Sequence, residues 1–176
     1  MPSFNIDFVK KFCDPDLYDV FIETGTHYGG TLSQMQDYFE EVHTIELSEK
    51  LYNITSEKYK KDNTIFHLGD SSKVLPQILP SIDKPTILFL DGHFCFGDSA
   101  QGDKDCPLYE ELQSINDLLK TNAIVVIDDF RLFGRGSWKS ITEDGCTNIV
   151  KDRLIKKIIK PSNESKRDRL ILFIKS

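Results

Sequence analysis

The sequence lacks the features that mark membrane-spanning and secreted proteins. Its longest uninterrupted apolar runs, such as residues 87–90 and 123–127, fall far short of the roughly 20 residues that a membrane-spanning helix requires. The first eleven residues mix Asn5, Asp7 and two lysines with apolar side chains, which is not the charged-then-apolar order of a signal peptide. We therefore expect a cytoplasmic protein that makes no membrane contact.

Paired cysteines, a basic excess and internal repeats are also missing. Cys13, Cys95, Cys106 and Cys146 show no close paired spacing, which favours reduced thiols over a disulfide framework or a structural zinc site. With 22 Lys and Arg against 28 Asp and Glu, the net charge is −6, and an acidic balance argues against nucleic-acid binding. A chain of 176 residues without repeats or linkers predicts a single domain over residues 1–176.

What the sequence does contain is an alternation of short β-branched or aromatic runs with longer segments of helical pattern, which predicts an α/β fold. The expected strands are residues 19–23, 42–46, 64–68, 86–91 and 123–128. Each is apolar enough to be covered on both faces, as in a parallel sheet. The expected helices are residues 31–40, 49–61, 71–79, 107–120 and a last one that starts with the capping-box spacing of 140–143 and runs to about 152.

The end of the chain has a different pattern. Residues 155–160 and 169–175 flank turn material that begins with Pro161, and this arrangement predicts an antiparallel hairpin. The complete expectation is a Rossmann-like, doubly wound and mostly parallel sheet with a C-terminal antiparallel hairpin.

The first expected strand runs directly into a glycine-rich turn. The residues of this region that could face a ligand are Glu23, Gly25, Thr26, Gly29 and Gly30. Glycines let a ligand approach the backbone, and free N–H groups at the start of the following helix would favour a carboxylate or phosphate. The spacing does not match the dinucleotide fingerprint G-x-G-x-x-G, so a plain strand-to-helix turn is the alternative.

Two acidic residues end the next two expected strands. Glu46 lies 21 residues after Gly25, at the position where an acid can accept hydrogen bonds from both hydroxyls of a ribose. Asp70, followed by Ser71, closes the third strand, where it could face the amino group of an adenine or cap the next helix. These acids indicate a nucleoside site, with a surface carboxylate and a helix cap as the alternatives.

Further polar residues end the fourth and fifth expected strands: Asp91 and His93 after one, Asp128 and Asp129 after the other. Ligands of open α/β sheets bind at the carboxyl ends of the strands. Three carboxylates at close quarters repel one another unless a cation lies among them, and oxygen ligands favour Mg²⁺, Mn²⁺ or Ca²⁺. Helix capping is the alternative, although one aspartate would be enough for a cap.

From residue 19 to the last strand, the chain resembles the class I S-adenosylmethionine-dependent methyltransferases. Residues 23–30 look like the first motif of this family, Glu46 like its ribose-binding acid and Asp70 like its adenine-side aspartate. The resemblance implies that Gly25 and its neighbours flank the methionine end of the cofactor. It also implies that Glu23 contributes through the cofactor's ammonium group or through a water molecule.

The acidic cluster looks like the metal site of the cation-dependent O-methyltransferases, of the catechol, caffeoyl-CoA and macrocin-like types. The resemblance implies that Asp91, Asp128 and Asp129 hold the cation, which would lower the pKa of the acceptor hydroxyl. The catechol-type enzymes have a Lys three positions after the first metal aspartate, where this chain has Phe94. His93 therefore becomes the candidate base beside Asp91, with a metal ligand or a hydrogen-bond partner of a ligand as alternatives.

We thus expect an S-adenosylmethionine-dependent, divalent-metal-assisted O-methyltransferase that acts on a small-molecule or sugar hydroxyl. One alternative is a metal-dependent hydrolase or hydroxylase-like protein that uses the same Asp and His residues without a methyl donor, and another is a cofactor-binding protein without catalysis. The catechol-type enzymes cover the substrate with N-terminal helices, whereas 18 residues precede the first expected strand here. An open site or a homodimer could take their place.

Two loops should border the acceptor. Residues 94–106 would overhang the metal site, and residues 131–138 could form the opposite wall, from which Arg135 and Trp138 could contact the substrate. The alternative for Trp138 is packing beneath a loop.

Overall fold

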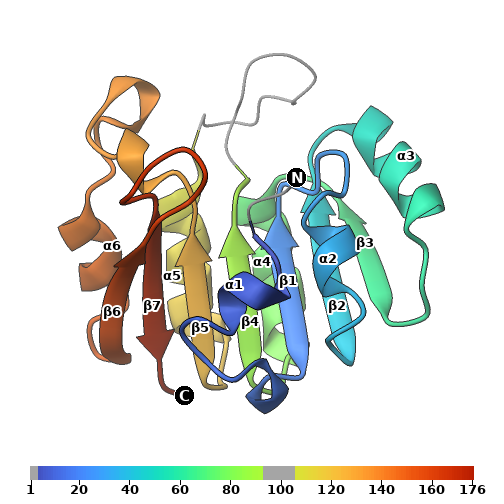
Figure 1. Cartoon of the computed structure of the whole chain (residues 1–176), viewed down its shortest axis with the longest axis horizontal. Coiled ribbons are helices and arrows are strands. Elements are labelled where there is room, and N and C mark those ends of the chain that lie inside the picture. Colours follow the sequence, from blue (N-terminus) through green and yellow to red (C-terminus); the bar gives the residue numbers. More distant parts are fainter. Residues whose placement is uncertain (1–3, 93–105) are drawn as a thin grey trace.

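The computed structural model describes residues 4–92 and 106–176, which form a central sheet between two layers of helices (Figure 1). The strands are β1 (Val20–Thr24), β2 (Glu41–Glu46), β3 (Thr64–Leu68), β4 (Thr86–Leu90), β5 (Ala123–Ile127), β6 (Leu154–Lys160) and β7 (Arg169–Ile174). They pair in the order β3-β2-β1-β4-β5-β7-β6. Strands β1 to β5 are parallel, and β7 runs antiparallel to both β5 and β6. The expected mostly parallel sheet with a closing antiparallel hairpin is confirmed.

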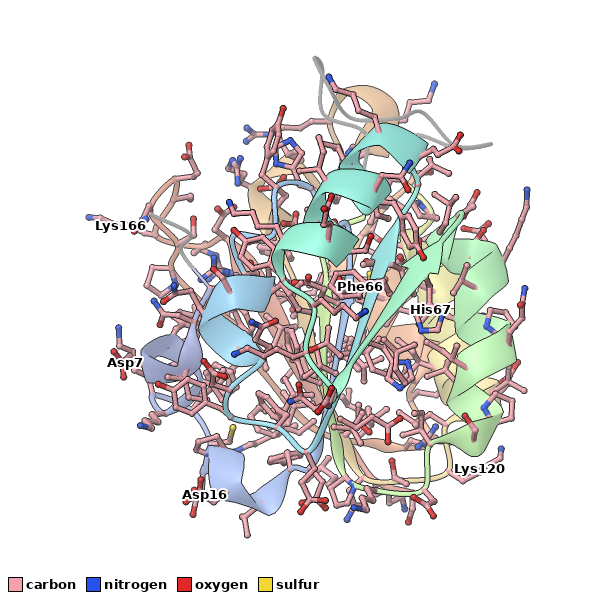
Figure 2. All side chains as sticks on the ribbon, turned by 90° about the vertical axis from the view of Figure 1, so that its right-hand side faces the viewer. Asp7, Asp16, Phe66, His67, Lys120 and Lys166 are labelled. Atoms are coloured by element: carbon pink, nitrogen blue, oxygen red, sulfur yellow. The ribbon has the colours of Figure 1, made fainter. Side chains whose placement is uncertain are left out.

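Helices cover both faces of the sheet. The α-helices are α1 (Ile6–Val9), α2 (Leu32–Met35), α3 (Glu49–Lys58), α4 (Ser71–Ile78), α5 (Leu108–Leu118) and α6 (Glu143–Ile149), and short 3₁₀ turns cover Pro15–Leu17, Leu79–Ser81, Phe130–Leu132 and Gly136–Trp138. Figure 2 shows α1, marked by Asp7, on one side of the sheet and α4 on the other. Within the described residues, no helix has the length and apolar character that crossing a membrane would demand.

The core consists of two apolar layers, one on each face. Phe21, Ile87 and Val126 pack with α1 and α2, and Ile22 and Val125 pack with α4 and α5. Strands β1, β4, β5 and β7 are buried along their whole length. This burial explains why they read as continuous apolar runs and not as alternating ones.

Several expected helix boundaries were wrong by three residues or more, and side chains from elsewhere in the fold explain two of them. Helix α2 ends at Met35 and not at residue 40. Asn63 Nδ2 donates to the carbonyls of Gln36 (2.8 Å) and Phe39 (2.9 Å), and a helix that reached residue 40 would use the Gln36 carbonyl itself. Helix α6 begins after Thr142, whose side chain accepts the Gly145 N–H.

The expected cap for α6 was Ser140. The hydroxyl of Tyr109 donates to the Ser140 carbonyl and accepts the Thr142 N–H, both at 3.0 Å, and so keeps this segment extended.

Candidate functional site

The polar residues singled out in the sequence follow neighbouring strands at one edge of the sheet. Four backbone N–H groups, those of Gly25, Gly69, Asp91 and Asp128, each donate to a carbonyl of the adjacent strand at 2.9–3.2 Å. These bonds tie the ends of β1 to β5 into one continuous rim. Glu23, Glu46, Asp70, Asp91 and Asp128 therefore lie along the same edge.

The glycine turn after β1 fits closely against the end of β4. Gly25 has a φ of +82°, and a Cβ built on it would lie 2.5 Å from the carbonyl oxygen of Asp91. Gly29 also has a positive φ and packs on the ring of Tyr59. Position 25 therefore requires glycine for two reasons: the positive φ, and the backbone at the end of β4, which leaves no room for a Cβ.

The N–H groups of the glycine turn itself bond within the protein. The N–H groups of Gly25 and Thr26 donate to Ile45 O, that of His27 to Glu46, and that of Gly29 to Thr26 O. These four donors are therefore used inside the protein. These bonds fix the shape of the turn, and an anion site at the N–H groups of the following helix stays a prediction.

We predict that Gly25→Ala destabilises the protein much more than Gly134→Ala. Both glycines have positive φ values, +82° and +75°, but nothing lies within 4 Å of a Cβ at Gly134. Gly134→Ala should cost about 1–2 kcal/mol of conformational strain alone, whereas Gly25→Ala adds the clash with Asp91. Urea unfolding of both variants measures the difference, and equal losses would contradict the close approach.

Glu46 is a buried carboxylate with both oxygens held by the backbone. Its Oε2 accepts the N–H of His27 at 2.7 Å, and its Oε1 accepts the N–H of Ser48 at 2.8 Å. These bonds leave acceptor capacity on each oxygen, because an ionised carboxylate has about four lone-pair sites. Glu46 therefore joins the glycine turn to β2 and can still receive two further hydrogen bonds.

Glu23 lies beneath the glycine turn in a chain of buried side chains. The hydroxyl of Thr44 donates to Glu23 Oε1 at 2.6 Å and also lies 2.5 Å from the hydroxyl of Thr26. Burial raises the pKa of Glu23 to about 8, the Thr44 hydrogen bond opposes the rise, and the charges of Asp91 and Glu46 add to it. The charges of Glu46 and Asp91 therefore favour the protonated form of Glu23.

The raised pKa of Glu23 predicts a pH-dependent stability. Between the ordinary value of 4.5 and about 8, the folded state binds a proton that the unfolded state has lost, so stability falls as pH rises through this window. Relative to Glu23→Gln, the wild type should lose up to about 1.4 kcal/mol of unfolding free energy per pH unit. Urea unfolding between pH 5 and 8 tests this, with the exposed Glu57→Gln as control. Parallel profiles for wild type and Glu23→Gln would contradict it.

Asp70 caps helix α4. Its Oδ1 accepts both the N–H (2.9 Å) and the hydroxyl (2.6 Å) of Ser72. Capping, one of the two interpretations of Asp70, is therefore observed. The contact with an adenine stays a prediction, as does a role for the buried Ser71.

The acidic residues after β5 belong to a larger ionic cluster. Oxygens of Asp128, Asp129 and Asp168 lie within 4.8 Å of one another, the one group among the described residues with the spacing of a metal site. Arg169 Nε donates to Asp128 at 3.1 Å. Arg131 Nη1 donates to Asp129 and, at 2.7 Å, to Asp168. Burial raises the pKa of Asp128, and the charge of Arg169 opposes this rise.

The cluster fits a divalent cation in number and kind of donor, although two arginines already offset part of its charge. Asp168 is 1% exposed and also accepts bonds from Ser162 and from the N–H of Arg131. The Asp128 and Asp129 side chains are each 14% exposed. A cation would therefore reach Asp128 and Asp129 first.

The expected metal ligands are only partly brought together. Asp91 is not a member of the group with metal-site spacing, in which Asp168 takes its place. The trio of Asp91, Asp128 and Asp129 stays a prediction. His93, the candidate base, lies outside the described residues, as do Cys95 and most of the expected overhanging loop.

Sequence reasoning missed Asp168 and Arg169, and it placed Arg131 in a wall of the site without its bonds to the acidic cluster. The expected C-terminal hairpin could have indicated these residues. An antiparallel strand that pairs with β5 begins at the edge of the sheet where β5 ends. Leu170 pairs with Ile127, so the two residues before Leu170 face the two residues after Ile127.

The other residues considered for the site are Trp138 and Arg135, and two histidines of the sheet lie near one another. Trp138 is buried and packs 5.9 Å from the ring of Phe133, whereas Arg135 is exposed. His43 Nδ1 lies 2.9 Å from His67 Nε2, and burial lowers the pKa of His67 to about 4. These two histidines are packed and hydrogen-bonded to each other.

Comparison with solved structures places this fold among known ones. The chain aligns over 100% of its length with 100% of a Streptococcus mutans protein that is assigned as a methyltransferase and is in complex with S-adenosylhomocysteine (TM-score 0.66, 15% identity). It aligns over 96% of its length with 79% of an O-methyltransferase from Bacillus cereus, also in complex with S-adenosylhomocysteine (TM-score 0.63, 14% identity). It aligns over 91% of its length with 55% of spermidine synthase from Thermotoga maritima (TM-score 0.61, 12% identity), and so spans about half of that protein.

No protein-family model and no curated protein matches the sequence itself. At these identities the likeness establishes the class I methyltransferase fold, and the chemistry must be argued from the site.

Proposed function

From the class I methyltransferase fold of this chain, we propose that it transfers a methyl group from S-adenosylmethionine to a hydroxyl oxygen of a small molecule or sugar. The observation that carries the proposal is Glu46, a buried carboxylate held by the N–H groups of His27 and Ser48 with acceptor capacity to spare. It ends β2, next to the glycine turn, where an acid can receive both hydroxyls of a ribose.

The charges at this end of the sheet suit the cofactor. S-adenosylmethionine carries a sulfonium and an ammonium group, and the acidic residues Glu46 and Asp91 lie beside the glycine turn, with Glu23 buried beneath it. Opposite charges at short range in a partly buried site attract strongly. Glu23 would serve the ammonium end, Gly25, Thr26, Gly29 and Gly30 would border the methionine end, and Asp70 and Ser71 would lie toward the adenine.

On the acceptor side, Asp128 and Asp129, together with Asp91, would hold a divalent cation. When bound, Mg²⁺ or Mn²⁺ would lower the pKa of an acceptor hydroxyl and fix its position. Arg169 holds Asp128 through its Nε, and Arg131 holds Asp129, so the protein itself orients both carboxylates. His93 is the proposed base that removes the hydroxyl proton.

Calorimetry with S-adenosylhomocysteine tests the cofactor half of the proposal. We expect micromolar binding of this ligand to the full chain. No binding, with or without Mg²⁺, would reject the methyltransferase function and leave a metal-dependent hydrolase or hydroxylase-like protein as the alternative. Binding without transfer to any hydroxyl acceptor would indicate a cofactor-binding protein without catalysis.

The cation has its own test. Binding of Mn²⁺ removes the free-ion signal in electron paramagnetic resonance, and we expect one site in the wild type that is lost in Asp129→Asn. The matched control is Asp117→Asn, because Asp117 is an exposed acid on α5 at the opposite end of the sheet. Undiminished Mn²⁺ binding by Asp129→Asn would remove the metal from the proposal and leave the methyl transfer untouched.

A further inference from the structure

The two halves of the rim at the carboxyl ends of the strands carry opposite charge. The segments that follow β1 to β4, residues 23–31, 46–49, 69–72 and 91–92, contain five Asp and Glu and no Lys or Arg. The segments at the ends of β5, β6 and β7, residues 128–139 and 160–169, contain seven Lys and Arg against four Asp and Glu. The segment 161–168 lies at the same end of the sheet as the turns after β5 (Figure 1).

The guanidinium of Arg131, in the basic half of the rim, is held by two carboxylates. Its Nη1 donates to both Asp129 and Asp168, and its backbone N–H lies 3.4 Å from Asp168 Oδ1. Because Asp168 is buried, with 1% of its side chain exposed, it holds the guanidinium in one orientation. An arginine fixed in this way loses little side-chain entropy when it binds a further group.

The other edge of this guanidinium is open. Among the described residues, Nε and Nη2 of Arg131 donate no hydrogen bond, and 31% of the side chain is exposed. These two N–H groups form the side-on fork that pairs with two oxygens of a carboxylate or phosphate. Arg131 contacts both Asp129 and Asp168 through Nη1 alone, so these contacts do not use Nε and Nη2.

Further cations lie in the segments that carry Arg131 and Asp168. The guanidinium of Arg167 lies 6.0 Å from the ring of Phe130, the residue next to Arg131. Arg135, Lys139 and Lys166 are exposed, and Figure 2 shows Lys166 reaching away from the body of the protein. The segments at this end of the sheet carry seven Lys and Arg against four Asp and Glu, and this excess favours an anionic acceptor over a neutral one.

We propose that the methyl acceptor is an anion, with a phosphate or carboxylate group that the Nε and Nη2 of Arg131 bind side-on. This inference rests on the proposed function, because it assigns the acidic half of the rim to the cationic cofactor and the basic half to the acceptor. A small oxyanion is favoured over nucleic acid because one oriented fork is a point site, and the chain as a whole is acidic, with a net charge of −6.

Nuclear magnetic resonance of the arginine side chains tests this directly. The full chain has five arginines, so it gives five Nε–H signals, and the probes are phenyl phosphate, benzoate and the neutral benzyl alcohol. In the presence of S-adenosylhomocysteine, we expect the Arg131 signal to shift saturably with phenyl phosphate or benzoate and to stay fixed with benzyl alcohol. The tighter of the two anions identifies the oxyanion. Arg153 is the internal control, because its Nε is already bonded to the carbonyl of Lys175 at 2.7 Å.

Arg131→Lys keeps the charge that neutralises Asp129 and Asp168 but removes the fork, and it should weaken anion binding about tenfold. An unmoved Arg131 signal in the wild type, or equal affinity in Arg131→Lys, would overturn the proposal. Much tighter binding of single-stranded oligothymidylate, with a steep salt dependence, would overturn it in favour of nucleic acid. A protein that binds phenyl phosphate at Arg131 but does not bind S-adenosylhomocysteine would reject the proposed function alone.

Discussion

Glu46→Ala is expected to weaken binding of S-adenosylhomocysteine by about 100-fold or more, since hydrogen bonds to a charged group contribute about 1.5–3 kcal/mol each. The variant removes both proposed ribose contacts. It also removes the acceptor for the His27 N–H, which fixes the glycine turn to β2. Calorimetric titration measures the affinity.

The matched control for this prediction is Glu49→Gln, because Glu49 is exposed and lies three residues further along, at the start of α3. Its titration should resemble that of the wild type. Glu46→Gln keeps the shape and one acceptor oxygen and should give an intermediate loss. An affinity of Glu46→Ala within threefold of the wild type would show that the cofactor does not use this carboxylate.

Arg169→Ala should cost about 3–5 kcal/mol of unfolding free energy, because it leaves a carboxylate without its buried partner. Arg169 is 1% exposed and donates to Asp128 at 3.1 Å. Its guanidinium also lies 4.6 Å from the ring of Phe8 and 5.5 Å from that of Phe4. Chemical unfolding measures the loss, and the exposed Arg167→Ala should change stability by about 0.5 kcal/mol or less.

A double-mutant cycle separates the ion pair from the aromatic contacts. If the cost comes mainly from the uncompensated charge, Asp128→Asn combined with Arg169→Met should lose clearly less than the sum of the two single variants. Additive losses would mean that the contacts of Arg169 with the phenylalanines, and not its bond to Asp128, account for the effect.

The strands that end at the site could be predicted from local sequence. The apolar runs of β1, β4 and β5 are visible in the sequence because these strands are buried on both faces. The positions of Gly25 and Glu46 could be predicted for the same reason, since each ends or follows such a run. Helix α2 could not, because its length depends on Asn63, which reaches the carbonyl of Gln36 from 27 residues away.

The acceptor half of the site was the least predictable part. Local pattern identifies β6 and β7 as a hairpin, but it does not say that β7 pairs with β5. Only that pairing brings Arg169 to Asp128, 41 residues apart in the chain, and Asp168 to Arg131. As a result, the sequence predicts an uncompensated acidic cluster where the fold contains a partly neutralised one.

Arg169 lies near the C-terminus and contacts Phe4 and Phe8 near the N-terminus, and its guanidinium is buried away from water. Lys10 and Lys11 are exposed just beyond the second ring, which makes them accessible to trypsin. A single cut there would free the short peptide that carries both rings and let water reach the guanidinium. Damage at the N-terminus would therefore reach Asp128, which depends on that guanidinium for its orientation.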